Sequence, residues 1–272
     1  MHREGINGHL PLSLRRRIIG DVDAVGSLGF TSLAMKHLLG IQHCATNDLE
    51  QMISLGEAAK KNRGSSNDPY RNLLSGQTWG MIFSKASTRT RVSFEVGVRE
   101  MGGSALYLSS RDMQLGRGEP IEDTARVLGR MVHGAIIRTF EQSDVESFSE
   151  HSGIPTINAL TDEEHPCQII ADLVSIREKF GTWEGKKIVF LGDGDNNMSR
   201  SWMWAAERLG FDLVVAGPEQ CLPDEAFRSR LGGERVSFSS DVDSAVADAH
   251  VLYTDVWVSM GQEALDDAER ER

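Results

Sequence analysis

The sequence has few cysteines, no long apolar run and fewer basic than acidic residues, and each shortage narrows what the protein can be. Its three cysteines, Cys44, Cys167 and Cys221, are widely scattered, which argues against a disulfide framework and for reduced thiols in a cytosolic protein. No Cys-x-x-Cys pair or His/Cys cluster in the sequence indicates a metal site. No apolar run approaches the ~18 residues that a membrane-spanning helix needs. The net charge of −11 disfavours nucleic acid or an anionic membrane as a partner.

The rest of the composition is that of an ordinary globular protein, with 40% hydrophobic and 25% charged residues among 272. That length fits one large domain or two ordinary ones. Short apolar runs alternate with segments whose apolar residues recur at helical spacing, which predicts an α/β fold with parallel sheets. The expected strands are 79–83, 105–108, 135–137 and 155–159 in the first half, and 188–191, 213–216, 236–238 and 251–253 in the second. Helical spacing of the apolar residues also predicts helices over 121–132, 202–209 and 224–231.

A helix is predicted between these two sets of strands. Proline is favoured at a first helical position, so the helix should begin at Pro166, and Gly181 should end it. We therefore expect two Rossmann-like parallel-sheet domains joined by a bridging helix. Ligands of such sheets bind at the carboxyl ends of the strands, so polar residues that follow strands are the candidates for function.

A dinucleotide site is not expected in the second half. After strand 188–191, the position of the third fingerprint glycine is occupied by Asn197. The carboxylates of Asp193 and Asp195 would also repel a pyrophosphate, and the fingerprint is weak even when complete.

The turn after strand 79–83 is dense in hydroxyl and guanidinium groups. It leads into a helix, whose first N–H groups are unpaired and carry partial positive charge. Ser87, Thr88 and Thr90 add hydroxyl donors, and Arg89 adds a planar cation. Such a turn suits a phosphate dianion. The alternative is an ordinary capped helix with solvated arginines.

Two arginines of this region are expected to differ in role. Arg89 and Arg91 are two positions apart, so on a helix they point to different faces. We assign Arg89 to the ligand and Arg91 to structure, as the partner of Glu95 four positions later. Arg138 ends another strand and should lie at the same edge of the sheet as the turn.

A further polar group, the run His165-Pro166-Cys167-Gln168, opens the bridging helix. A neutral imidazole just before the helix can donate a hydrogen bond to a carbonyl oxygen. The alternative is a histidine that only caps the helix. We interpret Cys167 as a small packing residue, because no base that could activate it is evident nearby.

Together these motifs resemble those of the aspartate/ornithine carbamoyltransferases. Ser87-Thr88-Arg89-Thr90-Arg91, followed by Ser93-Phe94-Glu95, is similar to the carbamoyl-phosphate motif of that family, and the run from His165 to Gln168 is similar to its second motif. Further matches are Ile137-Arg138-Thr139, Met113-Gln114-Leu115-Gly116, Asn196-Asn197-Met198 and the loop from Asp255 to Glu263. The resemblance extends from about Met35 to Glu263, with the motifs in family order.

The resemblance implies a role for each matched residue. The carbamoyl-phosphate ligands would be Ser87, Thr88, Arg89, Thr90, Gln114, Arg138, His165 and Gln168. The ornithine ligands would be Asn197, Asp255, Ser259 and Met260. Arg89, Arg138 and His165 would be catalytic. In the family the Gln114 loop reaches into a neighbouring subunit's site, although from spacing alone Gln114 is an ordinary polar loop residue, and Asp255 an ordinary turn aspartate.

The implied reaction is transfer of the carbamoyl group from carbamoyl phosphate to the side-chain amine of L-ornithine, giving L-citrulline and phosphate in arginine biosynthesis or catabolism. The Ser259-Met260-Gly261 run, with no basic loop beside it, favours ornithine over aspartate as the acceptor. No metal or organic cofactor is implied. The expected partners are the two small-molecule substrates and other copies of the chain, since the family forms trimers.

Three regions are expected. Residues 1–34 form a non-conforming N-terminal extension, which does not resemble the family. Residues 35–180 form a carbamoyl-phosphate-binding domain, and 181–272 form an ornithine-binding domain. Family members continue past the 255–263 loop with a His-Cys-Leu-Pro motif that this sequence lacks. We therefore expect a truncated second domain and little turnover. Two alternatives stay open, a sister carbamoyltransferase with another amine acceptor and a non-catalytic carbamoyl-phosphate-binding remnant.

Overall fold

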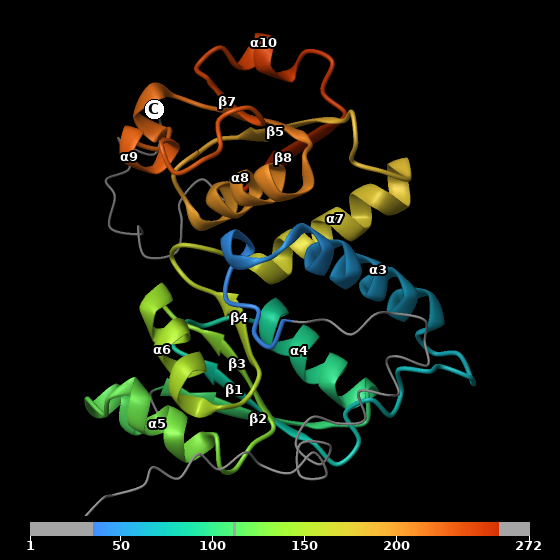
Figure 1. Cartoon of the computed structure of the whole chain (residues 1–272), viewed down its shortest axis with the longest axis vertical. Helices are drawn as coiled ribbons and strands as arrows, with labels where there is room; N and C mark the ends of the chain where they lie inside the picture. Colours follow the sequence, from blue (N-terminus) through green and yellow to red (C-terminus); the bar gives the residue numbers. More distant parts are fainter. Residues whose placement is uncertain (1–34, 111–112, 256–272) are drawn as a thin grey trace, which may run out of the picture.

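Two four-stranded parallel sheets, one above the other, organise the chain (Figure 1). The computed structural model describes residues 35–110 and 113–255. The expected extension 1–34 and the candidate ligands Ser259 and Met260 lie outside the described residues.

The first sheet has the strand order β2-β1-β3-β4. Its strands are β1 (Thr78–Phe83), β2 (Ser104–Ser109), β3 (Gly134–Arg138) and β4 (Thr156–Leu160). Every residue of β3 is buried, because helices cover both faces of the sheet. Helix α4 (Arg89–Glu100) packs on one face, and helices α5 (Ile121–Leu128) and α6 (Gln142–Ser152) pack on the other. All strand pairs are parallel, so the carboxyl ends of the strands share one edge.

The second sheet has the order β7-β6-β5-β8 and is also parallel. Its strands are β5 (Lys187–Leu191), β6 (Asp212–Ala216), β7 (Val236–Ser239) and β8 (Val251–Thr254). Helix α8 (Asn197–Leu209) buries its apolar face against one side, and the short helix α10 (Val242–Val246) packs on the other. The single-turn helix α9 (Glu225–Arg228) follows β6.

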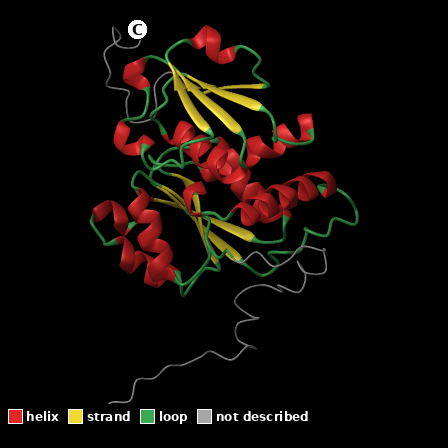
Figure 2. Ribbon diagram, turned by 45° about the horizontal axis from the view of Figure 1, so that its top comes forward, coloured by secondary structure: helices red, strands yellow, loops and turns green. Residues whose placement is uncertain are grey.

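Helices fill the space between the two sheets (Figure 2). Helix α3 (Thr46–Asn62) lies along α7 (Pro166–Phe180), which is the bridging helix expected from the sequence. Ile53, Leu173 and Trp202, from α3, α7 and α8, are fully buried in one common core. None of the described helices is long and apolar enough to cross a membrane.

Residues 38–44, which we call the strap, link the first sheet to the second half of the chain. Leu38 forms a parallel bridge with the edge strand β4. The 3₁₀ helix η1 (Ile41–His43) follows, and Ile41 is buried in the core around α8. Arg208, near the end of α8, donates to the Gln42 carbonyl oxygen at 2.5 Å. The strap therefore ties the strands of one sheet to a helix of the other.

The α/β class with two parallel sheets is confirmed, and each expected strand is present within one or two residues. The expected helix ends were wrong in three places. Helix α8 begins at Asn197, five residues before the expected 202, because the Asn196 side chain accepts from the Met198 and Ser199 N–H groups, each at 2.9 Å. Helices α5 and α9 are shorter than the expected 121–132 and 224–231.

Candidate active site

A cavity of about 840 Å³ lies where the carboxyl ends of the two sheets face each other. The turn after β1, the end of β3 and the segment after β4 line it from the first sheet. The segment after β5 and the end of β8 line it from the second sheet. The cavity is thus placed where parallel sheets bind ligands, and it is shared between the two halves of the chain.

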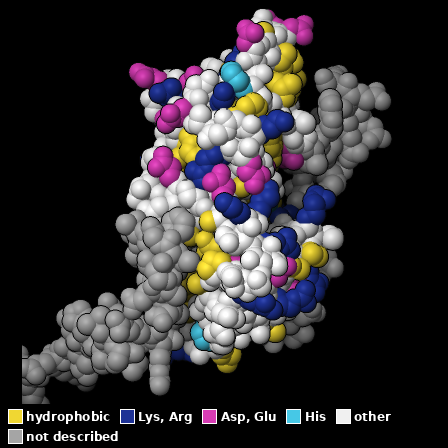
Figure 3. Space-filling model, turned by 90° about the vertical axis from the view of Figure 1, so that its right-hand side faces the viewer, with side chains coloured by type: hydrophobic (Ala, Val, Ile, Leu, Met, Phe, Trp, Pro, Cys, Tyr) yellow, Lys and Arg dark blue, Asp and Glu magenta, His cyan; other side chains and the backbone are white. Residues whose placement is uncertain are grey.

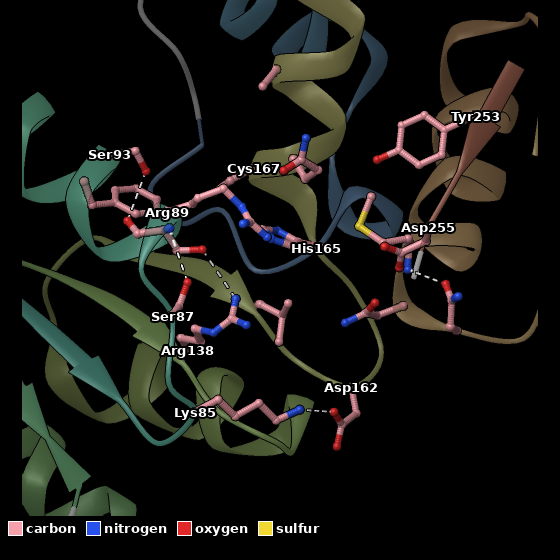
Figure 4. A pocket seen from close by; sticks show the side chains of 18 of the residues that line it. Lys85, Ser87, Arg89, Ser93, Arg138, Asp162, His165, Cys167, Tyr253 and Asp255 are labelled. Carbon is pink, nitrogen blue, oxygen red and sulfur yellow. Dashed lines mark hydrogen bonds and ion pairs between the residues drawn. The ribbon is translucent and has the colours of Figure 1, made fainter. Parts of the chain in front are cut away.

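The turn at residues 87–90 forms one wall of this cavity (Figure 4). Helix α4 begins there at Arg89, whose side chain is exposed. The Thr90 N–H donates to the Ser87 Oγ at 3.2 Å, and Arg138 Nη1 donates to the Thr90 Oγ1 at 3.5 Å. Those contacts tie the turn to the end of β3. The wall presents a helix N-terminus, hydroxyl groups and two guanidinium groups to one space, and such a set of donors and positive charges is chemically suited to a phosphate group.

Arg138 is the buried cation of this wall, with 3% of its surface exposed. Burial lowers the pKa of its guanidinium, and the neighbouring charge of Arg89 lowers it further. Two like charges held this close repel each other, and a bound dianion would relieve the repulsion.

His165 is held at the start of α7, facing the arginine wall (Figure 4). Its backbone N–H donates to the Ser201 Oγ at 2.8 Å. Burial, followed by the charge of Arg138, lowers the pKa of the imidazole to about 4, so the ring is neutral at pH 7. A neutral ring can donate to an oxygen in the cavity without adding a charge to the ligand. Its Nδ1 is buried and has no hydrogen-bond partner in the described part of the chain.

Two amide side chains of the cavity have fixed orientations. Gln168 Nε2 donates to Asp172 Oδ1 at 3.0 Å, and Asn197 Nδ2 donates to the Thr161 carbonyl oxygen at 2.7 Å. Carboxylate and carbonyl oxygens accept hydrogen bonds, so in these two contacts the NH₂ end of each amide faces the acceptor. The carbonyl oxygens of Gln168 and Asn197 are left to accept hydrogen bonds from a ligand.

Charge is distributed unequally across the cavity. Three cations, Lys85, Arg89 and Arg138, line it from the first sheet, together with one carboxylate, Asp162, which pairs with Lys85. From the second sheet the charged lining residues are Asp195 and Asp255. The surface in Figure 3 shows the same trend, with Asp and Glu more frequent over the upper half. A ligand set with an anion at one end and an ammonium at the other matches this polarity.

Lys85 is also tied to the segment after β4. Its ammonium forms an ion pair with Asp162 and lies 4.4 Å from the centre of the Phe140 ring. The side chain of Lys85 is only 6% exposed, whereas that of Asp162 is 54% exposed. The pair joins the turn after β1 to the loop that leads to His165.

Most of the residues predicted from the sequence meet in this cavity. Those that line it are Ser87, Arg89, Thr90, Arg138, His165, Gln168, Asn197 and Asp255. Thr88 lines a neighbouring cavity of about 720 Å³ instead. Gln114, on the 3₁₀ helix η3 (Gln114–Arg117), is exposed and does not line the cavity of its own chain. Arg91 pairs with Glu95 at 3.7 Å and lies over the Tyr107 ring, as expected for a structural residue.

Sequence reasoning gave no role in the site to six other polar residues of the cavity, namely Lys85, Ser93, Asp162, Asp195, Asn196 and Tyr253. Lys85 and Asp162 each follow a strand by two residues, so their positions were a usable signal. Tyr253 lies within a predicted strand, and nothing in the local sequence marks it as a cavity residue. No group of three or more His, Cys, Asp or Glu side chains that could hold a metal ion occurs among the described residues.

Comparison with known proteins adds independent findings. Residues 36–178 match the family profile "Aspartate/ornithine carbamoyltransferase, carbamoyl-P binding domain", and residues 184–272 match "Aspartate/ornithine carbamoyltransferase, Asp/Orn binding domain". The chain is 58% identical to an ornithine carbamoyltransferase of Akkermansia muciniphila over 85% of this chain and 75% of that protein. It is 46% identical to one of Methanocorpusculum labreanum over 84% of this chain and 74% of that protein. Its structure is similar to that of the Pyrococcus furiosus ornithine carbamoyltransferase, with a TM-score of 0.80 at 44% identity, covering 89% of this chain and 78% of that one.

Proposed function

Because the chain belongs to the aspartate/ornithine carbamoyltransferase family, we propose that it transfers the carbamoyl group of carbamoyl phosphate to the side-chain amine of L-ornithine. The products are L-citrulline and phosphate. One observation supports this choice of substrates. A single cavity has cations and a helix N-terminus on the first-sheet side and carboxylates on the second-sheet side. Carbamoyl phosphate supplies the anion, and ornithine supplies the amine.

In the proposed mechanism the first sheet holds the donor substrate. The phosphate binds the Ser87–Thr90 turn and Arg89, where the helix N-terminus offsets its charge. The carbonyl oxygen receives hydrogen bonds from Arg138, Thr90 and the neutral His165. These donors stabilise the negative charge that develops on that oxygen, and loss of one such donor typically costs about 10²–10³ in rate. Gln168 accepts from the carbamoyl NH₂ through its carbonyl oxygen.

The second sheet holds the acceptor substrate in this proposal. Asn197 and Asp255 contact ornithine, together with Ser259 and Met260. The deprotonated side-chain amine attacks the carbamoyl carbon, the C–O bond to phosphate breaks, and the amine loses a proton. The rate should rise with pH as this amine loses its ammonium proton. Holding the two substrates in line supplies much of the remaining acceleration, and no cofactor takes part.

The domain division and the assembly are part of the same proposal. Residues 35–180 would bind carbamoyl phosphate and 181–272 would bind ornithine. The chain would work in the cytoplasm as a homotrimer, in which Gln114 enters a neighbour's site, without a nucleic-acid or membrane partner. The exposed position of Gln114 supports this arrangement, as does the second cavity, which opens beside Thr88 and Arg89 and contains Val92 with 53% of its surface exposed.

A calorimetric titration tests the proposal stepwise, first with phosphonoacetamide, a stable analogue of carbamoyl phosphate, and then with L-norvaline, an ornithine analogue without the amine. We expect phosphonoacetamide to bind and to strengthen the binding of norvaline. Citrulline formation with ornithine, compared with carbamoylation of aspartate and putrescine, tests the acceptor. Binding of neither analogue, or equal turnover of all three amines, would contradict the proposal.

A further inference from the structure

Two buried polar atoms next to Tyr253 lack partners. Asp172 Oδ2 and Trp202 Nε1 are buried and have no hydrogen-bond partner in the part of the chain that the structure describes. Both side chains lie close enough to the Tyr253 hydroxyl to shift its pKa, although neither contact has full hydrogen-bond geometry. Buried donors and acceptors are rarely left unpaired in folded proteins, so this arrangement calls for an explanation.

Tyr253 belongs firmly to the second sheet. It lies on β8, and its ring stacks on Phe190 at 5.7 Å and meets Trp202 edge-on at 5.3 Å, measured between ring centres. Its hydroxyl is directed toward α7 (Figure 4). Burial and the charge of Asp172 raise the pKa of the hydroxyl, so it stays protonated. It can therefore accept from Trp202 Nε1 and donate to Asp172 Oδ2 at the same time.

Asp172, the neighbour of the Tyr253 hydroxyl, lies on the bridging helix α7. It lies one helical turn after Gln168 on α7, and its Oδ1 accepts from Gln168 Nε2 at 3.0 Å. A carboxylate offers no donor, so it holds the Gln168 amide with the NH₂ group turned toward α7. Gln168 itself lines the cavity.

From these contacts we propose that Asp172 is a positioning residue that fixes the Gln168 carbonyl oxygen toward the NH₂ group of the substrate, and that Tyr253 holds Asp172 in place from the second sheet. The inference rests on the proposed function. It adds a chain of hydrogen bonds from Trp202 through Tyr253 and Asp172 to Gln168. In this chain of contacts, a residue of the second sheet supports the orientation of a side chain that contacts the first substrate.

Two ligands that differ in one group test the proposal. Phosphonoacetamide carries a carbonyl and an NH₂ group, and 2-oxopropylphosphonate replaces the NH₂ with a methyl group of similar size. We expect the wild-type chain to bind the amide roughly tenfold more tightly, as one net hydrogen bond of about 1.4 kcal/mol would give. Asp172→Asn should lower this preference by about threefold or more, because an asparagine can hold Gln168 in either orientation. Affinity for the methyl ketone should stay within about twofold.

Three further variants make the result specific. Tyr253→Phe, which keeps the ring packing and removes the hydroxyl, should lower the preference in the same direction by a smaller factor. Gln168→Leu should abolish the preference. Ser175→Ala, on an exposed position of the same helix, is the matched control and should leave both affinities unchanged. Thermal unfolding of each variant shows whether the fold is retained.

Each outcome has a distinct meaning. An Asp172→Asn chain that binds both ligands more weakly by the same factor has lost structure rather than orientation, which would overturn the positioning role. An unchanged preference in Tyr253→Phe would overturn the link to the second sheet. If the wild-type chain binds neither ligand, the proposed function itself fails. If it binds both equally and Gln168→Leu changes nothing, only the further inference fails.

Discussion

Replacing Glu164 with Gln should change how the stability of the protein depends on pH. This carboxyl group precedes His165 and is 1% exposed. It accepts from the Ile41 N–H at 2.7 Å and, more weakly, from the Gln42 N–H at 3.4 Å, so it holds the strap against the loop before α7. Burial raises its pKa from 4.5 to about 7, against the opposing effect of these N–H contacts.

The magnitude follows from the difference between the folded and unfolded pKa values. Between pH 4.5 and 7 the folded chain binds the Glu164 proton more strongly than the unfolded chain does, so the free energy of unfolding falls as pH rises. Each unit of difference corresponds to about 1.36 kcal/mol, so the loss is about 3 kcal/mol and is complete above the folded pKa of about 7. A glutamine at this position does not titrate and keeps the short contact with Ile41.

Urea unfolding at pH 5 and at pH 8 measures this effect. Relative to the wild type, the unfolding free energy of Glu164→Gln should increase by about 3 kcal/mol between the two pH values. Glu150→Gln, at an exposed position of α6, is the control and should follow the wild-type curve. A wild-type and a Glu164→Gln curve that stay parallel within about 1 kcal/mol, which is less than one pKa unit, would refute the reasoning.

Three other outcomes are expected. Arg89→Gln should weaken phosphonoacetamide binding about 10- to 100-fold in calorimetry, since hydrogen bonds to charged groups contribute about 1.5–3 kcal/mol, and an unchanged Kd would contradict its assignment. The His165 ring should show no protonation between pH 6 and 8 in NMR spectra, because its pKa is lowered to about 4. Gly40→Ala should lower stability by about 1–3 kcal/mol, since a Cβ there would overlap the Glu164 carboxylate. Gly97→Ala, in an open position of α4, should instead raise the stability by about 0.5–1 kcal/mol. Thermal unfolding of the Gly40→Ala and Gly97→Ala variants measures both effects.

The two sheets, and the cavity wall that contains Arg89 and Arg138, were predictable because they depend on the local pattern of apolar and polar residues. Short apolar runs of three to five residues mark the expected strands, and polar residues that follow them must lie at the shared edge of a parallel sheet. Arg138, at the end of β3, follows this rule, and Arg89 lies in the turn that begins after β1. Lys85 also follows the rule and could have been found by applying it more strictly.

The parts that were missed depend on contacts between distant segments. The start of α8 was misplaced because the Asn196 side chain, rather than the apolar period, fixes it. Tyr253 and Asp172 carry no motif, and their relation exists only because β8 and α7 pack together across 81 positions (253 minus 172). Periodicity assigns each residue to an element, but it contains no information about which elements meet.

The strap has a consequence for how the chain reaches its folded state. Its contact with Arg208 joins positions 166 residues apart, and Ile41 is buried in a core built largely from the second half. On the ribosome, the strap and α3 emerge long before α8 and cannot bury their apolar faces until that helix follows. Such long-range closure slows folding and leaves apolar surface open to aggregation in the meantime. The two halves are therefore expected to fold cooperatively, and separating them between α7 and β5 would expose this shared core on both fragments.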